Sequence, residues 1–289
     1  MEIANMKINP VRFAALIAVL LTGFCLSGAA DAAAQAQIKT RKVRISDFTT
    51  KTTKVVLRGE DGLSSAIVSE VTSRWRLSPY EFCDTEEYGK LKSSSDYYFL
   101  LLTGGSGQGE SGILSLTLVK GGSEQDPDPS KESLTLVRFP LCSAENPSGR
   151  ELTLLPAAID IIQDFTYRAM LSDKNAYSNL TAYAARNAKR KVERIVFAPE
   201  EVSGVKSELL RGGISVCEEA DELFEQGGEG TLVSFTVAPT VPAGGQFCYK
   251  MLIDAGTHEL YRFRRERVRE SSAVSYTNSE IKKLRVRIR

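Results

Sequence analysis

The chain has 289 residues, of which 42% are hydrophobic and 25% are charged, and its formal net charge is +1. The length predicts two domains with enough apolar residues for substantial cores, and the composition is that of a soluble globular protein. The near-zero net charge argues against a nucleic-acid binder and against a strongly acidic scaffold.

Residues 1–34 have the pattern of a secretory signal peptide. Lys7 and Arg12 precede an apolar run at 13–26, and small residues that offer Ala-x-Ala cleavage sites follow. The run is too short to span a bilayer, so we expect cleavage between Ala30 and Ala36 rather than a retained membrane anchor. The mature protein is therefore predicted to be exported to the periplasm or the extracellular space.

Cys25 raises the alternative of a lipoprotein. The bulky Phe24 immediately before it argues against lipidation, because a lipobox has small residues there. No later run is long and apolar enough to cross a membrane, so the sequence predicts no transmembrane segment in the mature chain.

Four cysteines follow the signal peptide, and export would place them in an oxidising compartment. They are candidates for disulfide bonds, and three complete pairings are open to them; buried free thiols are the alternative. None has the Cys-x-x-Cys spacing of a zinc or redox motif. These cysteines are Cys83, Cys142, Cys217 and Cys248.

Residues 35–150 contain a first α/β unit. Val43 and Ile45 alternate with charges and predict a short edge strand. Apolar runs and helical spacing then predict strand, helix, strand, helix and strand, and two alternating segments predict an added hairpin. The predicted elements lie at 55–57, 63–74, 80–83, 84–90, 97–102, 113–119 and 133–139.

A glycine cluster at 104–112 follows the third strand of this unit. Gly107, Gly109 and Gly112 match the spacing of a dinucleotide-binding fingerprint, which requires a helix to start at the loop. The residues at 113–119 alternate like a strand, so a hairpin loop is favoured over a nucleotide site.

Residues 151–191 are predicted to be a helical connector. Apolar residues recur at three- and four-residue spacing from Leu155 to Met170, with Pro156 in the first turn. A second helix is expected at 177–187, before a cationic end at 189–191.

Residues 192–289 repeat the order of the first unit. Strands are expected at 194–197, 213–217 and 232–237, with an amphipathic helix ending at Leu210 and an acidic helix at 218–225. In both units a cysteine ends the middle strand, and the third strand is entered about fifteen residues later. A hairpin is predicted at 247–264 around a turn at 254–257, and alternation at Leu284, Val286 and Ile288 predicts a last strand.

We therefore predict an α/β fold with an α+β tendency. It is built from two repeated β-α-β-α-β units, each with an added β-hairpin, joined by a helical segment. The expected divisions are 1–34, 35–150, 151–191 and 192–289.

Few residues carry recognisable chemistry. The single histidine, His258, is expected on the surface of the hairpin turn; a Ser-His-Asp triad or a Cys-His dyad would need it. One histidine excludes multi-histidine metal sites, and the sequence indicates no cofactor and no catalytic residue.

Two pairs of carboxylates are candidates for a site. Glu60 and Asp61 follow the first strand of the first unit, and Glu200 and Glu201 follow the first strand of the second. Ligand sites of α/β folds commonly lie at such strand ends. The alternative is that these acids favour the N-terminal ends of the following helices.

The signal ending in Ala34-Gln35-Ala36-Gln37, the duplicated unit and the segment at 248–261 together resemble uncharacterised exported proteins of Gram-negative bacteria. That segment reads Cys-Tyr-Lys-Met-Leu-Ile-Asp-Ala-Gly-Thr-His-Glu-Leu-Tyr. The resemblance implies no activity. At the level of the fold, the unit resembles small Rossmann-like or anticodon-binding-like modules of envelope assembly proteins, and a fold alone does not assign a function.

The functional expectation is an exported, non-enzymatic binding or scaffold protein of the cell envelope. It would bind another envelope protein or a surface glycan in the groove between the units, and no nucleic acid. The alternative is a carboxylate-dependent glycan hydrolase, and a weaker one is nucleotide binding through 104–112.

Overall fold

The computed structural model describes residues 41–105, 109–122, 135–241, 245–268, 274–285 and 288. The predicted signal peptide with its cleavage sites and Cys25 lies outside the described residues. Within the described ranges, no helix has the length and apolar character needed to cross a membrane.

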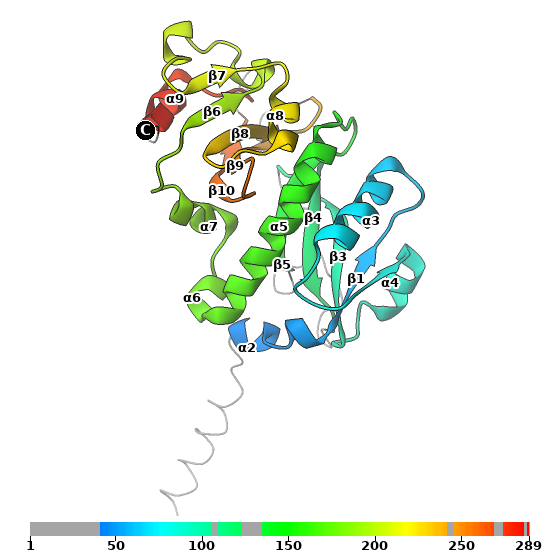
Figure 1. Ribbon diagram of the computed structural model, residues 1–289. Helices are drawn as coiled ribbons and strands as arrows, with labels where there is room; N and C mark the ends of the chain where they lie inside the picture. The colour runs from blue at the N-terminus through cyan, green and yellow to red at the C-terminus, as the bar shows by residue number, and fades with distance from the viewer. Residues whose placement is uncertain are drawn as a thin grey trace, which may run out of the picture.

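Two five-stranded mixed sheets form the molecule, and they share one strand order (Figure 1). The first sheet has the order β2-β1-β3-β4-β5, and the second has the order β7-β6-β8-β9-β10. In each sheet three parallel strands are continued by two antiparallel ones. The strands are β1 (Thr52–Val56), β2 (Tyr80–Cys83), β3 (Tyr97–Gly104), β4 (Ile113–Lys120), β5 (Thr135–Ser143), β6 (Arg194–Phe197), β7 (Ile214–Val216), β8 (Thr231–Val237), β9 (Phe247–Asp254) and β10 (Leu260–Arg267). The predicted α/β fold with two similar units is therefore confirmed.

Both predicted helices of the first unit begin at an aspartate. Asp61 caps α3 (Gly62–Arg74) by accepting a hydrogen bond of 2.6 Å from the backbone N–H of Ser64. Asp84 caps α4 (Thr85–Leu91) by accepting one of 2.7 Å from the N–H of Glu87. Each cap satisfies a backbone donor that the first helical turn leaves unpaired.

The edge strand predicted around Val43 and Ile45 was wrong, because this segment forms the short helix α2 (Arg41–Ile45). A strand would place both side chains on one face, whereas Ile45 is 3% exposed and Val43 is 52% exposed. A 3₁₀ helix, η1 (Phe48–Thr50), follows and buries Phe48 beside Tyr98.

The helix α5 (Arg150–Leu171) lies between the two sheets (Figure 1), with the short helices α6 (Asp173–Ala176) and α7 (Leu180–Asn187) after it. It begins earlier than predicted, so Pro156 lies in its second turn rather than its first. Leu152, four residues before the proline, is exposed, so water can reach that side of the helix.

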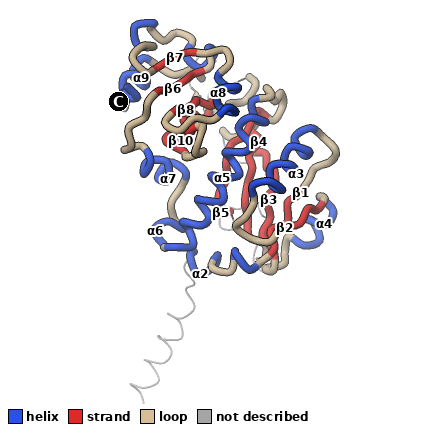
Figure 2. The backbone as a smooth tube through the Cα atoms, in the orientation of Figure 1, coloured by secondary structure: helices blue, strands red, loops and turns tan. Residues whose placement is uncertain are grey.

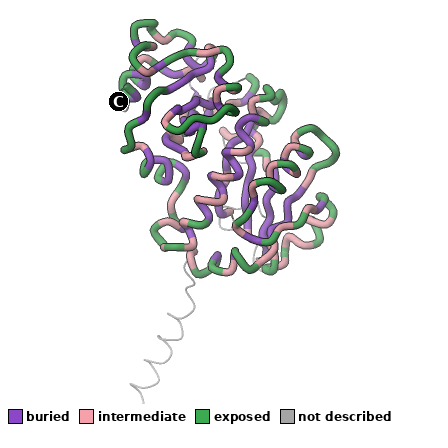
Figure 3. The backbone as a smooth tube through the Cα atoms, in the orientation of Figure 1, coloured by how far each residue is buried: buried purple, intermediate pink, exposed green. Residues whose placement is uncertain are grey.

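The residues of α5 are buried on nearly every side, as Figure 3 shows. One apolar cluster joins Val55 and Phe139 of the first sheet to Val233 and Met251 of the second, with Ile159 of α5 between them. The buried apolar residues of α5 thus face both sheets, and each of these faces requires an apolar partner. The two sheets therefore share a single core.

The outer face of each sheet has a smaller core of its own. In the first sheet, Val56 and Leu101 face α4, whereas their strand neighbours Val55 and Leu100 face the shared core. The outer face of the second sheet is covered by two 3₁₀ helices that follow β6 and by the C-terminal helix. Figure 2 shows the helices in blue around the red strands of both sheets.

Two predictions for the second unit were wrong. The helix expected up to Leu210 is a pair of 3₁₀ helices, η2 (Pro199–Val202) and η3 (Ser207–Leu209), interrupted by Gly204 with φ +85°. A positive φ ends a right-handed helix, and glycine adopts it without steric cost. The acidic helix was found as α8 (Ala220–Gln226).

The last strand expected from Leu284 to Ile288 is also wrong, because Leu284 belongs to the helix α9 (Asn278–Arg285). Thr277 and Glu280 form a reciprocal capping box: the N–H of Thr277 donates to Glu280 Oε2 at 3.0 Å, and the N–H of Glu280 donates to Thr277 Oγ1 at 3.3 Å. Ile288 makes an isolated parallel bridge with Val192, and Val286 lies outside the described residues.

Truncation of the central helix tests the shared core. We expect Ile159→Ala to lower the free energy of unfolding by about 2–5 kcal/mol, because it leaves a cavity that both sheets line. In denaturant titrations the fluorescence of Trp75, the only tryptophan of the chain, and the far-UV circular dichroism should report one transition.

Leu171→Ala is the matched control, because this residue of the same helix is 55% exposed. We expect it to change stability by less than about 0.5 kcal/mol. Two separated transitions in the Ile159 variant or the unmodified chain would contradict a shared core.

Candidate functional site

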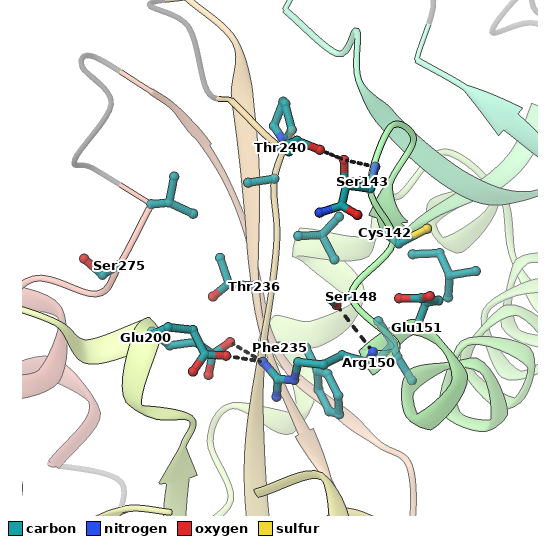
Figure 4. Close-up of a pocket in the computed structure, with 18 residues that line it drawn as sticks. Cys142, Ser143, Ser148, Arg150, Glu151, Glu200, Phe235, Thr236, Thr240 and Ser275 are labelled. Carbon is teal, nitrogen blue, oxygen red and sulfur yellow. Dashed lines mark hydrogen bonds and ion pairs between the residues drawn. The ribbon is translucent and has the colours of Figure 1, made fainter. Parts of the chain in front are cut away.

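A cavity of about 410 Å³ lies where the two units meet, at the N-terminal end of α5 (Figure 4). The first unit contributes the end of β5 and the segment that enters α5, and the second contributes η2, β8 and the segment before α9. Its polar lining residues are Ser143, Asn146, Ser148, Arg150, Glu151, Glu200, Glu201, Thr236, Thr240 and Ser275.

The cavity lies at the carboxyl ends of two parallel strands, β6 and β8. This is the edge of an open α/β sheet at which ligands commonly bind. A hydrogen bond of 2.6 Å between the hydroxyls of Ser143 and Thr240 joins the two units beside it.

Arg150 is the cation at the centre of this site. Its guanidinium binds Asp221 of α8 in a bidentate manner, with Nε–Oδ2 at 3.0 Å and Nη2–Oδ1 at 2.8 Å. Nη1 lies 3.3 Å from Glu201 Oε1 and 3.7 Å from Glu200 Oε1, and Nη2 donates to the carbonyl of Ser234 at 3.0 Å. One arginine of the central helix therefore fixes three acids of the second unit.

Glu201 is the least exposed acid of the cavity, with only 2% of its side chain exposed. Its Oε2 accepts a hydrogen bond of 3.3 Å from the backbone N–H of Ala198. Burial raises the pKa of this carboxyl group, and the nearby Arg150 opposes that shift. Next to it, the buried hydroxyl groups of Ser234 and Thr236 interact with the Glu201 carboxyl group and also oppose the rise in its pKa.

Of the four carboxylates suggested by the sequence, the structure brings only Glu200 and Glu201 to this cavity. Asp61 caps α3, and Glu60 beside it is exposed; neither lines the cavity. Sequence reasoning missed Arg150, because an arginine after a glycine at the start of a helix carries no signal of its burial.

The four cysteines of the described residues are free thiols. Cys142 lines the cavity, and burial raises its pKa to about 12, so its thiol stays protonated at neutral pH. Burial also raises the pKa values of Cys83 and Cys248 to about 11. Cys83 and Cys217 are not equivalent in the two units. Cys83 pairs with Val56 in register and belongs to the outer core of the first sheet, whereas Cys217 follows Val216, the register partner of Phe197, and packs against the shared core.

His258 is not a free surface residue of the turn. Its Nδ1 lies 2.7 Å from Asp160 Oδ2 on α5, its ring stacks on Phe224 at 5.4 Å, and its side chain is 15% exposed. Asp160 also accepts a hydrogen bond of 3.0 Å from Arg74 of α3. The histidine therefore joins the hairpin turn of the second unit to the central helix.

The glycine loop has the geometry of a hairpin, since β3 and β4 pair antiparallel through Gly104 and Leu114 and no helix follows the loop. Gly109 and Gly112 have φ values of +89° and +84°, and Gly107 lies outside the described residues. The N–H of Phe247 in the second unit donates to the carbonyl of Gly109 at 2.6 Å. Gly109 and Gly112 therefore lie where the backbones of the two units come close together.

Comparison with protein-family models, with curated proteins and with solved structures gave no match. Among the described residues, no group of three or more histidine, cysteine, aspartate or glutamate side chains is arranged to hold a metal ion. The function is therefore inferred from the site itself.

Replacement of Arg150 tests how much the burial of Glu201 destabilises the protein when its cation is missing. We expect Arg150→Met to lower the free energy of unfolding by about 3–5 kcal/mol at pH 7, because it leaves a buried carboxylate unpaired. This loss of stability should be smaller below pH 4.5, the usual pKa of glutamate, because Glu201 is then protonated in the folded and in the unfolded protein. The loss should grow as the pH rises.

Adding Glu201→Gln to the Arg150→Met variant should restore most of the lost stability and flatten this pH dependence. Denaturant titrations between pH 4 and pH 8 measure both effects. If Arg150→Met lowers the free energy of unfolding equally at every pH, or if the double variant is no more stable than Arg150→Met, the loss of stability does not come from Glu201.

A glycine comparison tests the structural role of the loop. We expect Gly112→Ala to lower the free energy of unfolding by about 1–2 kcal/mol, because its φ is positive. The added Cβ would also lie 3.1 Å from Cβ of Pro239. Gly89→Ala, inside α4 with open space around its Cα, should stabilise by about 0.5–1 kcal/mol. An unchanged stability of the Gly112 variant in denaturant titrations would argue against a packing role.

Proposed function

We propose that the protein is an exported, non-enzymatic binding protein of the cell envelope that holds its ligand in the cavity between the two units. Export rests on the signal-like pattern of residues 1–34. Binding is supported by the volume of the cavity, which is in the range of small-ligand sites, and by its place at the strand ends.

A surface glycan suits the lining best. Sugar hydroxyls donate to carboxylates, and they both donate to and accept from hydroxyl side chains. The cavity offers carboxylates at Glu151, Glu200 and Glu201, and Phe235 and Pro239 add apolar surface for the carbon face of a sugar ring.

The observation that carries the proposal is the hydroxyl of Thr236. It lines the cavity and lies against the buried Glu201 carboxyl group. A hydroxyl group that donates to a carboxylate can still accept a hydrogen bond through its oxygen lone pairs, so a sugar hydroxyl placed in the cavity can donate to Thr236.

A carboxylate-dependent glycan hydrolase is the second candidate, favoured by the raised pKa of Glu201. A general acid needs such a shift, and Glu200 or Glu151 would have to supply the second carboxylate. The low exposure of Glu201 and its contacts with Arg150 and the Ala198 N–H favour a structural role instead.

Calorimetric titration of the mature protein with a panel of envelope oligosaccharides tests the proposal. We expect at least one to bind, and Thr236→Val to weaken that binding about tenfold, because the ligand loses a buried hydrogen bond. Thr52→Val, in β1 of the first sheet, is the matched control and should leave the affinity unchanged.

Incubation of the same panel with the protein separates the two candidates. Release of new reducing ends that Glu201→Gln abolishes would establish hydrolysis and contradict a non-enzymatic role. Binding that Thr236→Val leaves unaltered would place the ligand elsewhere on the molecule.

A further inference from the structure

We propose a second binding site, for an anion with an apolar body, in a groove that three arginines line on the same seam between the units. We call it the arginine groove. It has a volume of about 340 Å³ and is formed by β5, the C-terminal half of α5, the start of α7, and β9 and β10. Its lining residues are Arg41, Thr135, Leu136, Val137, Arg138, Phe165, Ser178, Asn179, Leu180, Thr181, Tyr249, Phe263 and Arg265.

Among the described residues, the charged side chains that line this groove have one sign. Its charged lining residues are Arg41 of α2, Arg138 of β5 and Arg265 of β10. Behind them, Glu110 binds Arg138 at 3.3 Å through Oε2 and Arg265 at 3.1 Å through Oε1. One carboxylate therefore pairs with two of the three guanidinium groups, which leaves an excess of positive charge among the described residues for a ligand to neutralise.

Arg41 and Arg138 retain unmet hydrogen-bonding capacity. Arg41 donates to the backbone carbonyls of Thr135 and Leu136 at 2.6 and 3.2 Å, and it makes no ion pair within the described ranges. The Nε of Arg138 is buried and has no hydrogen-bond partner among the same residues. Guanidinium groups bind carboxylate and phosphate oxygens with two parallel hydrogen bonds, so these groups favour such an anion.

The arginines are held in place before any ligand binds. Arg265 stacks on the ring of Phe247 at 3.7 Å, and the Tyr249 hydroxyl donates to Glu110 at 2.8 Å. Arg41 is fixed by its two carbonyl contacts. Little side-chain entropy is lost when a ligand binds to groups that are already ordered.

The rest of the lining combines uncharged polar residues, such as Thr135 and Asn179, with apolar and aromatic ones. Phe165 lies on α5, and the rings of Tyr249 and Phe263 are 5.5 Å apart on neighbouring strands. The first turn of α7 closes the groove beside them, and the positive end of its dipole adds to the attraction for an anion. This combination suits an alkyl or aryl phosphate or carboxylate better than a bare inorganic ion.

This site is distinct from the glycan cavity. The cavity at the start of α5 is lined by three glutamates and one arginine, whereas the arginine groove has no acidic lining residue in the part of the chain that the structure describes. The two sites therefore select ligands of different charge, and the failure of one proposal leaves the other standing.

Calorimetric titration at low ionic strength with hexyl phosphate, hexanoate, inorganic phosphate and hexanol tests the proposal. We expect hexyl phosphate or hexanoate to bind with one-to-one stoichiometry and more tightly than inorganic phosphate or hexanol. Arg41→Gln and Arg265→Gln should each weaken that binding about tenfold, because each removes a charged hydrogen-bond donor.

Arg190→Gln is the matched control, because this arginine pairs with Glu259 outside the groove. Its affinity for the probe should equal that of the unmodified protein. Thermal melts of every variant show that the fold is retained, and Glu110→Gln should tighten binding, since it removes the one opposing charge.

Sedimentation with phosphatidylglycerol vesicles identifies the source of the anion. Vesicle binding that Arg41→Gln abolishes would indicate a lipid headgroup, and binding of the short probes alone would indicate a free ligand. The proposal would be overturned if neither the short anionic probes nor the vesicles bind. It would also be overturned if the Arg41 and Arg265 variants bind the probe as tightly as the unmodified protein does.

Discussion

The burial of α5 between two sheets is the constraint on which the rest of the structure depends. Leu155, Ile159 and Ile162 are completely buried, and the cluster to which they belong extends into both sheets. Neither unit can move away without exposing an apolar helix to water, at a cost of about 25 cal/mol per Å². The seam between the units is therefore a fixed part of the fold.

Polar contacts along the same helix set how the second unit sits on it. Arg150 at its first turn binds Asp221, Thr153 donates to Glu225 at 2.8 Å, and Asp160 meets His258 of the hairpin turn. Apolar packing is not directional, so it does not by itself fix the orientation of the second unit on α5. These hydrogen bonds and ion pairs are directional and do fix it. These contacts anchor three different points in the N-terminal half of α5 to the second unit.

Much of the fold could be predicted from the sequence, because continuous apolar runs such as 97–102 and 232–237 mark buried strands in both units. The errors arose where local pattern and tertiary packing disagree. Val43 and Ile45 alternate like a strand, yet only Ile45 enters the core. The spacing of Thr277 and Glu280 was a readable capping box, whereas alternation at the chain end suggested a strand.

The candidate site was predictable only in part. Glu200 and Glu201 follow a strand at the edge where ligands bind, and that topological rule found them. Arg150, Thr236 and the three arginines of the arginine groove come from elements far apart in the sequence, and only the packing of the two units brings them together.

Native-state hydrogen exchange of the intact protein tests the shared core most directly. Because both sheets depend on α5, the slowest amides of β1, α5 and β8 should exchange with one common free energy, equal to that of global unfolding. Exchange of β8 at a clearly lower free energy, while β1 and α5 stay protected, would show that the second unit opens independently and would contradict this account.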